Sequence, residues 1–148
     1  MTKKTAKKSI VFYADDDQDD IELVVESFKR FSRNVDVYAF ENGAELLSFA
    51  DGLGPDDMQP CLIILDINMP MFNGKQTLLR LKKLEAFKKV PVILFSTSSM
   101  NNDKVFAEEN GAGFITKPLN MQQMEAIIEQ FIDACTEEVR GSIRRQLS

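Results

Sequence analysis

The sequence predicts an α/β fold in which a parallel sheet of five strands is covered by helices on both faces. Five short apolar runs, rich in branched or aromatic side chains, have the length and composition of buried strands. A helical pattern follows each run, so strand and helix alternate five times along the chain. Parallel strands need crossover connections, and those crossovers are usually helices, so the alternation predicts a parallel sheet.

The predicted elements follow one another with short connections. The strands are expected at Ile10–Ala14, Val35–Phe40, Cys61–Leu65, Val92–Phe95 and Gly113–Thr116. The first helix starts near Asp19 and Asp20, where acidic side chains favour a helix start, and carries apolar residues on one face up to Phe31. The later helices are expected at Ala44–Ala50, Lys75–Leu84, Asn102–Glu109 and from Met124 to Cys135.

Length and charge limit the class of protein. A chain of 148 residues fits one domain. Its 23 acidic and 18 basic side chains give a net charge of -5, which argues against non-specific binding to nucleic acid or to a membrane. The apolar run Ile10–Ala14 is too short for a signal peptide or a membrane span, so we expect a cytoplasmic protein. Cys61 and Cys135 lack the partners of a metal site and are predicted to be buried thiols in a reducing compartment.

Side chains that can carry chemistry stand at the ends of four predicted strands. They are Asp15, Asp16 and Asp17 at the first strand, Asp66 at the third, Ser96 and Thr97 at the fourth, and Lys117 at the fifth. Such sheets bind ligands outside the carboxyl ends of their strands. Carboxylates without His or Cys suit a hard cation, magnesium or manganese before zinc. With a lysine and a hydroxyl group they are the parts expected around a transferring phosphoryl group.

Each of these residues also has an ordinary structural interpretation. The aspartate run could be a solvated turn that caps the first helix, and Asp66 could simply form a turn. Ser96 and Thr97 could be turn hydroxyls with local partners, and a lone lysine is usually solvated. The agreement of four strand ends favours the functional interpretation. In addition, the bond between Lys117 and Pro118 is a candidate cis peptide that would aim the lysine inward.

Four segments at these strand ends make the chain resemble the receiver domains of bacterial response regulators of two-component systems. They are VFYADD, LIILDINMPMFNG, VPVILFST and FITKP, and their order makes the combined signal highly specific. The resemblance covers residues 9–135 and implies a doubly wound (βα)5 sheet with the flavodoxin-like strand order 2-1-3-4-5. It leaves residues 1–8 as a basic N-terminal tail and residues 136–148 as a C-terminal tail, with no output domain.

The resemblance implies a metal-dependent phosphoacceptor. Asp66 would attack a phosphohistidine of a sensor histidine kinase or a histidine phosphotransfer protein and form an acyl phosphate. Asp15, Asp16, Asp66 and the backbone carbonyl of Asn68 would hold Mg²⁺ or Mn²⁺, with Asp16 the closer ligand and Asp15 holding a bound water. The cation would neutralise charge on the phosphoryl oxygens.

The same resemblance implies a conformational switch. Lys117 would pair with Asp66 before phosphorylation and with a phosphoryl oxygen afterwards. Ser96 would move to bind the phosphoryl group, and Phe114 would turn inward behind it. Thr97 departs from the family pattern, which often has Ala or Gly there, and its extra bulk would narrow access to the phosphoryl group and slow its hydrolysis. The face made by the fourth helix, fifth strand and fifth helix would then signal to a downstream protein whose identity the sequence does not give, and a homodimer through that face is a further hypothesis.

The expected protein is therefore a phosphoacceptor and not an enzyme, with self-phosphorylation and slow autodephosphorylation as its only reactions. The alternative is a phosphatase of the haloacid dehalogenase type, but Asp19 spoils its DxDx[TV] motif and no strand after Lys117 carries its acidic pair. An EF-hand would need Gly where Asp20 stands. A flavin carrier would need a phosphate-cradling loop where the aspartates lie.

Overall fold

The computed structural model describes residues 9–54, 57–97, 100–118, 120 and 123–135. Both predicted tails, residues 1–8 and 136–148, lie outside this described part. The strands are β1 (Ser9–Ala14), β2 (Val35–Phe40), β3 (Leu62–Leu65), β4 (Val92–Ser96) and β5 (Gly113–Thr116). The helices are α1 (Gln18–Phe31), α2 (Gly43–Asp51), α3 (Gly74–Lys83), the 3-10 turn η1 (Glu85–Phe87), α4 (Asn101–Glu109) and α5 (Met124–Asp133).

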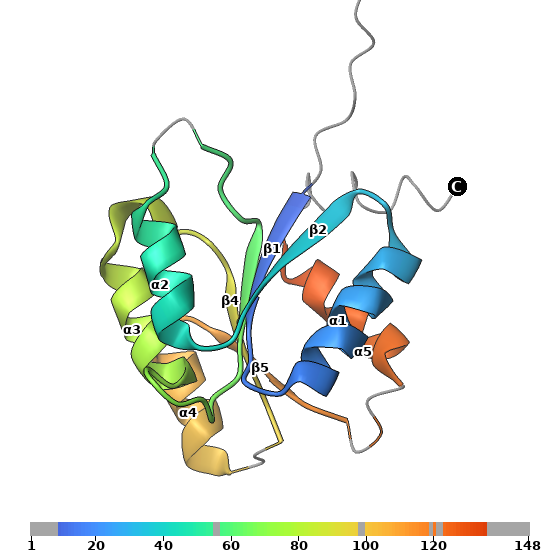
Figure 1. The fold of residues 1–148 in the computed structure, drawn as a ribbon. Helices are drawn as coiled ribbons and strands as arrows, with labels where there is room; N and C mark the ends of the chain where they lie inside the picture. The colour runs from blue at the N-terminus through green and yellow to red at the C-terminus, as the bar shows by residue number, and fades with distance from the viewer. Residues whose placement is uncertain (1–8, 55–56, 98–99, 119, 121–122, 136–148) are drawn as a thin grey trace, which may run out of the picture.

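The five strands form one parallel sheet in the order β2-β1-β3-β4-β5, which confirms the predicted topology. Helices α1 and α5 cover one face, and α2, α3 and α4 cover the other (Figure 1). The chain leaves β1 toward β2 on one side and returns to β3 on the other. The carboxyl ends of β1 and β3 therefore flank the point where strand order reverses, where a sheet of this kind binds its ligands.

The predicted element boundaries agree with the observed ones to within two residues. β2 and β5 have the predicted bounds, and β4 is one residue longer because Ser96 pairs with Thr116. Helix α1 begins at Gln18, earlier than expected, because Asp17 is its N-cap and accepts a hydrogen bond from the Asp20 amide at 3.1 Å. The turn η1 was not predicted, since three residues are too few to produce a recognisable period.

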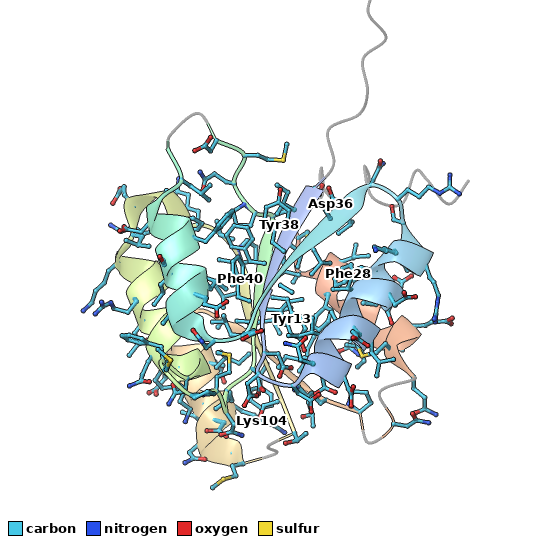
Figure 2. All side chains as sticks on the ribbon, in the orientation of Figure 1. Tyr13, Phe28, Asp36, Tyr38, Phe40 and Lys104 are labelled. Atoms are coloured by element: carbon cyan, nitrogen blue, oxygen red, sulfur yellow. The ribbon has the colours of Figure 1, made fainter. Side chains whose placement is uncertain are left out.

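The alternation of side chains along β1 divides the core between the two faces of the sheet. Phe12 and Ala14 pack with the apolar residues of α2 and α3, whereas Val11 and Tyr13 pack with those of α1 and α5. On the second face, Phe28 of α1 lies between its helix and the sheet (Figure 2) and stacks on Phe131 of α5, with ring centroids 6.0 Å apart. This packing fixes α1, and with it the loop that carries the aspartate run.

Two further sequence-based expectations concern the state of the cysteines and membrane-spanning segments. Cys61 and Cys135 are free thiols whose sulfur atoms lie 3.8 Å apart; Cys135 is buried and Cys61 is half-buried. Among the residues that the structure describes, no helix is both long and apolar enough to cross a membrane.

The turn after β3 brings α3 directly against the backbone of Asp66. Asn73 caps α3 through a reciprocal pair of hydrogen bonds with Gln76, at 2.9 and 3.0 Å. Gly74 begins the helix, and a Cβ atom added there would lie 2.4 Å from the carbonyl oxygen of Asp66 and 2.9 Å from the Cα of Ile67. Backbone atoms cannot move aside as a flexible side chain would, so this approach requires glycine.

We predict that Gly74→Ala destabilises the protein by about 1–3 kcal/mol, because the added methyl group overpacks the turn after β3. The matched control is Gly52→Ala, where the nearest atom to an added Cβ is 3.6 Å away and the backbone is helical. That variant should stay within about 1 kcal/mol of the parent protein. Denaturant unfolding followed by circular dichroism measures both, and equal stabilities for the two variants would contradict the prediction.

Candidate functional site

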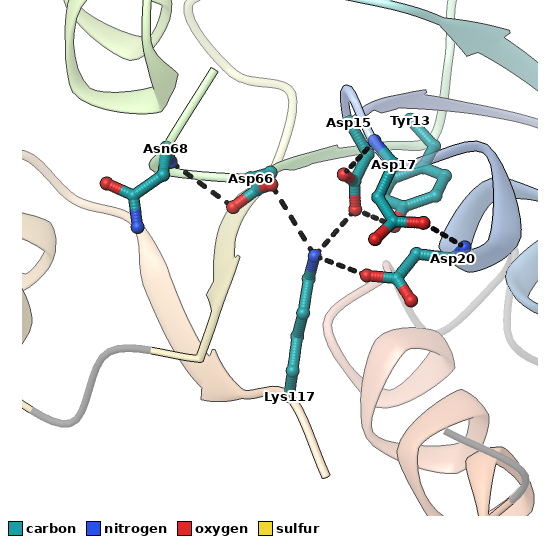
Figure 3. A network of polar contacts seen from close by, with 7 residues as sticks. All are labelled: Tyr13, Asp15, Asp17, Asp20, Asp66, Asn68 and Lys117. Atoms are coloured by element: carbon teal, nitrogen blue, oxygen red, sulfur yellow. Dashed lines mark hydrogen bonds and ion pairs between the residues drawn. The ribbon is translucent and has the colours of Figure 1, made fainter. Parts of the chain in front are cut away.

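The ammonium group of Lys117 lies at the centre of the carboxyl edge of the sheet. Its Nζ atom is 2.7 Å from Asp15 Oδ2, 2.9 Å from Asp20 Oδ2 and 3.5 Å from Asp66 Oδ2 (Figure 3). Lys117 follows β5, and its amide donates to the carbonyl of Ser96 at 2.8 Å, which continues the pairing of β5 with β4 past the last strand residue. Sheet pairing therefore directs a lysine that is only 7% exposed toward the aspartates.

Asp15 is fully buried, and both of its carboxylate oxygens accept hydrogen bonds. Oδ1 accepts from the Asp17 amide at 2.9 Å, while Oδ2 accepts from Lys117 and from the hydroxyl group of Tyr13. Tyr13 and Asp15 are two residues apart along the same strand direction, so their side chains lie on the same face. Burial and the nearby Asp15 charge raise the pKa of the Tyr13 phenol, which therefore remains a hydrogen-bond donor.

Asp66 leaves β3 beside Asp15, because β1 and β3 pair in parallel up to Ala14 and Leu65. Its amide donates to the carbonyl of Ala14 at 2.9 Å, and its Oδ1 accepts from the Asn68 amide at 3.2 Å. Burial, together with the negative charge of Asp15, raises the pKa of Asp66 to about 7. The positive charge of Lys117 and the bond from Asn68 act in the opposite direction but do not cancel the shift.

Lys117 keeps its positive charge in this buried position. Burial alone lowers the pKa of an ammonium group, because it removes the water that solvates the charge. The hydrogen bonds to Asp15 and Asp20 outweigh that effect and raise the pKa of Lys117 above its usual value. The site therefore contains one permanent cation among several acidic groups.

The acidic groups are arranged so that a metal ion could be shared among them. Asp15, Asp16 and Asp66 each offer one carboxylate oxygen, and these oxygens lie within 4.8 Å of one another. Asp16 is exposed, whereas the other two are buried. Oxygen donors of this kind match the preference of Mg²⁺ and Mn²⁺. The side chain of Asn68 is exposed, and the predicted role of its backbone carbonyl stays a prediction.

The predicted switch residues belong to the β4 and β5 region and differ in burial. Ser96 is fully buried at the end of β4, and Thr97, the next residue, is exposed. Phe114 of β5 is half-buried and packs against the core on the face of α2, α3 and α4. The structure thus places Ser96 beside Lys117 and Phe114 on the α4 side of the sheet. Their movements stay predictions.

The prediction of a cis peptide bond before Pro118 is wrong. No peptide bond among the described residues is cis, so the bond between Lys117 and Pro118 is trans. The tertiary amide before a proline still favours the trans form by about 0.5–1 kcal/mol. The hydrogen bond from Lys117 to Ser96 already directs the lysine inward, so a cis bond is not required for that purpose.

Two residues of the site were missed at the level of sequence. The sequence places Tyr13 in a buried strand, and the signal for its role is its position two residues before Asp15, which puts both side chains on one face. The sequence places Asp20 only at a helix start, and no sequence signal indicates that it reaches a lysine 97 residues further along the chain.

Met71 and Phe72, in the loop after Asp66, have left-handed backbones with φ of 50° and 73°, which side chains of this size rarely adopt.

Comparisons with known proteins agree with this geometry. The family model of the response regulator receiver domain matches residues 11–129. The response regulator Rcp1 of Synechocystis sp. is 23% identical over 132 residues, which cover 87% of this chain and 90% of Rcp1. A probable transcriptional regulator, ycf29 of Pyropia yezoensis, is 36% identical over 97 residues, 65% of this chain and 41% of ycf29. The chain therefore spans less than half of that relative.

Solved structures share the fold at similar coverage. The phosphorylated cyanobacterial phytochrome response regulator RcpA has a TM-score of 0.77 and 26% identity, covering 87% of this chain and 97% of its own. The Mn²⁺-bound form of Rcp1 has a TM-score of 0.73 and 23% identity, covering 82% and 90%. Because the family model spans most of the chain and the fold is the same, this chain belongs to the response regulator receiver domain family.

Proposed function

We propose that the protein is a phosphoacceptor of a two-component system, in which Asp66 accepts a phosphoryl group from the phosphohistidine of a sensor histidine kinase or a phosphotransfer protein. The observation that supports this most strongly is the meeting of Lys117 with Asp15 and Asp66 at the strand ends, in contacts of 2.7 and 3.5 Å. Asp15, Asp66 and Lys117 directly follow β1, β3 and β5.

The proposed reaction is a substitution at phosphorus. A carboxylate oxygen of Asp66 forms a bond to phosphorus, the P–N bond of the phosphohistidine breaks, and its electron pair stays on the imidazole. Lys117 supplies a positive charge for the phosphoryl oxygens. A divalent cation held by Asp15, Asp16 and Asp66 would favour ionised Asp66 and neutralise charge on the same oxygens. Manganese in the related Rcp1 supports this part of the proposal.

The signal would leave through the face made by α4, β5 and α5. A phosphoryl group on Asp66 adds acceptor oxygens next to Lys117 and Ser96, whose backbones are already joined by a 2.8 Å hydrogen bond. Only contacts that differ between the two states can shift their populations, so the new bonds from Ser96 and Lys117 to the phosphoryl group would supply the bias, with Phe114 turning inward as Ser96 moves. A downstream protein, or a second copy of the chain, would bind that face. This signalling would take place in the cytoplasm.

We predict that the purified protein, incubated with acetyl phosphate and Mg²⁺, gains one phosphoryl group that is stable in acid and labile in alkali. Asp66→Asn should abolish the gain, because it removes the nucleophile. Asp51→Asn, which changes an exposed carboxylate of α2, should label as the parent protein does. Intact-mass spectrometry measures the label. Labelling that persists in Asp66→Asn but is lost in Asp15→Asn would reject the proposal in favour of a dehalogenase-type nucleophile.

We predict that, without metal, the parent protein loses stability relative to Asp66→Asn as the pH rises. The folded-state pKa of Asp66, about 7, is above its usual 3.8, so the folded protein binds this proton more tightly than the unfolded chain. That contribution is complete below about pH 4 and is lost as the pH rises through about 7. One pKa unit corresponds to about 1.4 kcal/mol and the carboxylate is buried, so the loss should amount to a few kcal/mol.

Denaturant unfolding between about pH 4 and 8 in a metal chelator measures this difference. Asp51→Asn is the control, since its carboxylate lies on the surface of α2. Adding Mg²⁺ at pH 8 should narrow the gap, because a bound cation stabilises the ionised group. A constant difference between the parent protein and Asp66→Asn over this range would contradict the burial argument.

A further inference from the structure

Asp20 contacts Lys117, although it is neither the proposed phosphoacceptor nor one of the three carboxylates that could hold a metal ion. It lies in the first turn of α1, and its Oδ2 atom is 2.9 Å from Lys117 Nζ (Figure 3). Its side chain is 17% exposed, so the contact is largely removed from water. The N-cap of α1 is Asp17, and Asp20 contributes only its backbone amide to that cap. The carboxylate of Asp20 is therefore not needed to begin the helix.

Lys117 and a divalent cation would share two of their ligands. Asp15 and Asp66 belong to the group of oxygens that could hold a metal, and both also contact Lys117 Nζ. Asp20 is outside that group of oxygens. Two cations that rely on the same carboxylates repel each other, and in a buried site water screens that repulsion poorly. A carboxylate that pairs with Lys117 alone would reduce the competition between Lys117 and the cation for Asp15 and Asp66.

We propose that Asp20 is a positioning residue for Lys117, which keeps the ammonium group in the site while a divalent cation occupies Asp15, Asp16 and Asp66. When Asp15 and Asp66 bind the cation, Lys117 would still keep its 2.9 Å ion pair with Asp20. Lysine and metal can then both face the Asp66 carboxylate. The second part of this inference, their joint action on a phosphoryl group, rests on the proposed function, whereas the counter-ion role does not.

The neighbouring acid provides a matched comparison. Asp19 lies in the same first turn of α1 and carries the same charge, but it is exposed. The described contacts of Lys117 with acidic groups are those to Asp15, Asp20 and Asp66, and Asp19 is not among them. Asp19→Asn and Asp20→Asn therefore remove equal charge from one helix turn, and only the second removes a partner of the lysine.

The test is a comparison of Mg²⁺ dissociation constants by isothermal titration calorimetry. Asp20→Asn should bind Mg²⁺ about fivefold more weakly than Asp19→Asn, because Lys117 then competes with the cation for Asp15 and Asp66. In a Lys117→Gln background this difference should vanish, since no ammonium group is left to compete. Asp20→Glu keeps the charge within reach of Lys117 and should bind Mg²⁺ as the parent protein does.

Three results would overturn the proposal. They are equal constants for Asp19→Asn and Asp20→Asn, a difference that persists in the Lys117→Gln background, and an Asp20→Glu protein that binds as weakly as Asp20→Asn. Persistence without the lysine would mean that Asp20 acts only through its own charge on the cation. The titration involves no phosphoryl transfer, so its failure leaves labelling of Asp66 untouched, and a failure of labelling leaves the titration valid.

Discussion

The ion-pair group of Lys117 is the interaction on which the carboxyl edge of this sheet depends. Its partners Asp15, Asp20 and Asp66, together with the nearby Asp16, carry four negative charges against the one positive charge of Lys117, so these five groups have a net charge of -3 when all are ionised. Two of these acids, Asp15 and Asp66, are nearly inaccessible to water. Buried like charges are costly unless they are paired, and one ammonium group pairs them only in part. The remaining imbalance favours a divalent cation.

Parallel pairing of the strands holds these charges together. The register of β1 with β3 puts Asp15 and Asp66 side by side, and the hydrogen bond from Lys117 to Ser96 continues the register of β5 with β4. The approach of Gly74 to the Asp66 carbonyl then limits how the chain can leave the site. Stability and function are thus in conflict here. The contacts that position Asp66 also bury its charge next to another carboxylate.

Much of this arrangement could be predicted from the sequence, because strand ends of a parallel sheet meet at one edge. The alternation of elements predicted the parallel sheet, and the resemblance to receiver domains implied its strand order. The residues after four strands predicted the cluster around Asp66. The contact of Asp20 with Lys117 could not be predicted, since it depends on how far α1 rotates over the sheet, and packing of residues such as Phe28 and Phe131 sets that rotation. The bond before Pro118 is trans and not cis as predicted, because strand pairing, and not the proline, directs the lysine inward.

The position of the acyl phosphate in the chain decides whether Asp66 is the phosphoacceptor. Borohydride reduces an aspartyl phosphate to homoserine, and tandem mass spectrometry of the digested protein then shows which position has changed. After incubation with Mg²⁺ and a phosphodonor, we expect homoserine at position 66 and at no other aspartate. Homoserine at position 15 or 16, with position 66 unchanged, would contradict it.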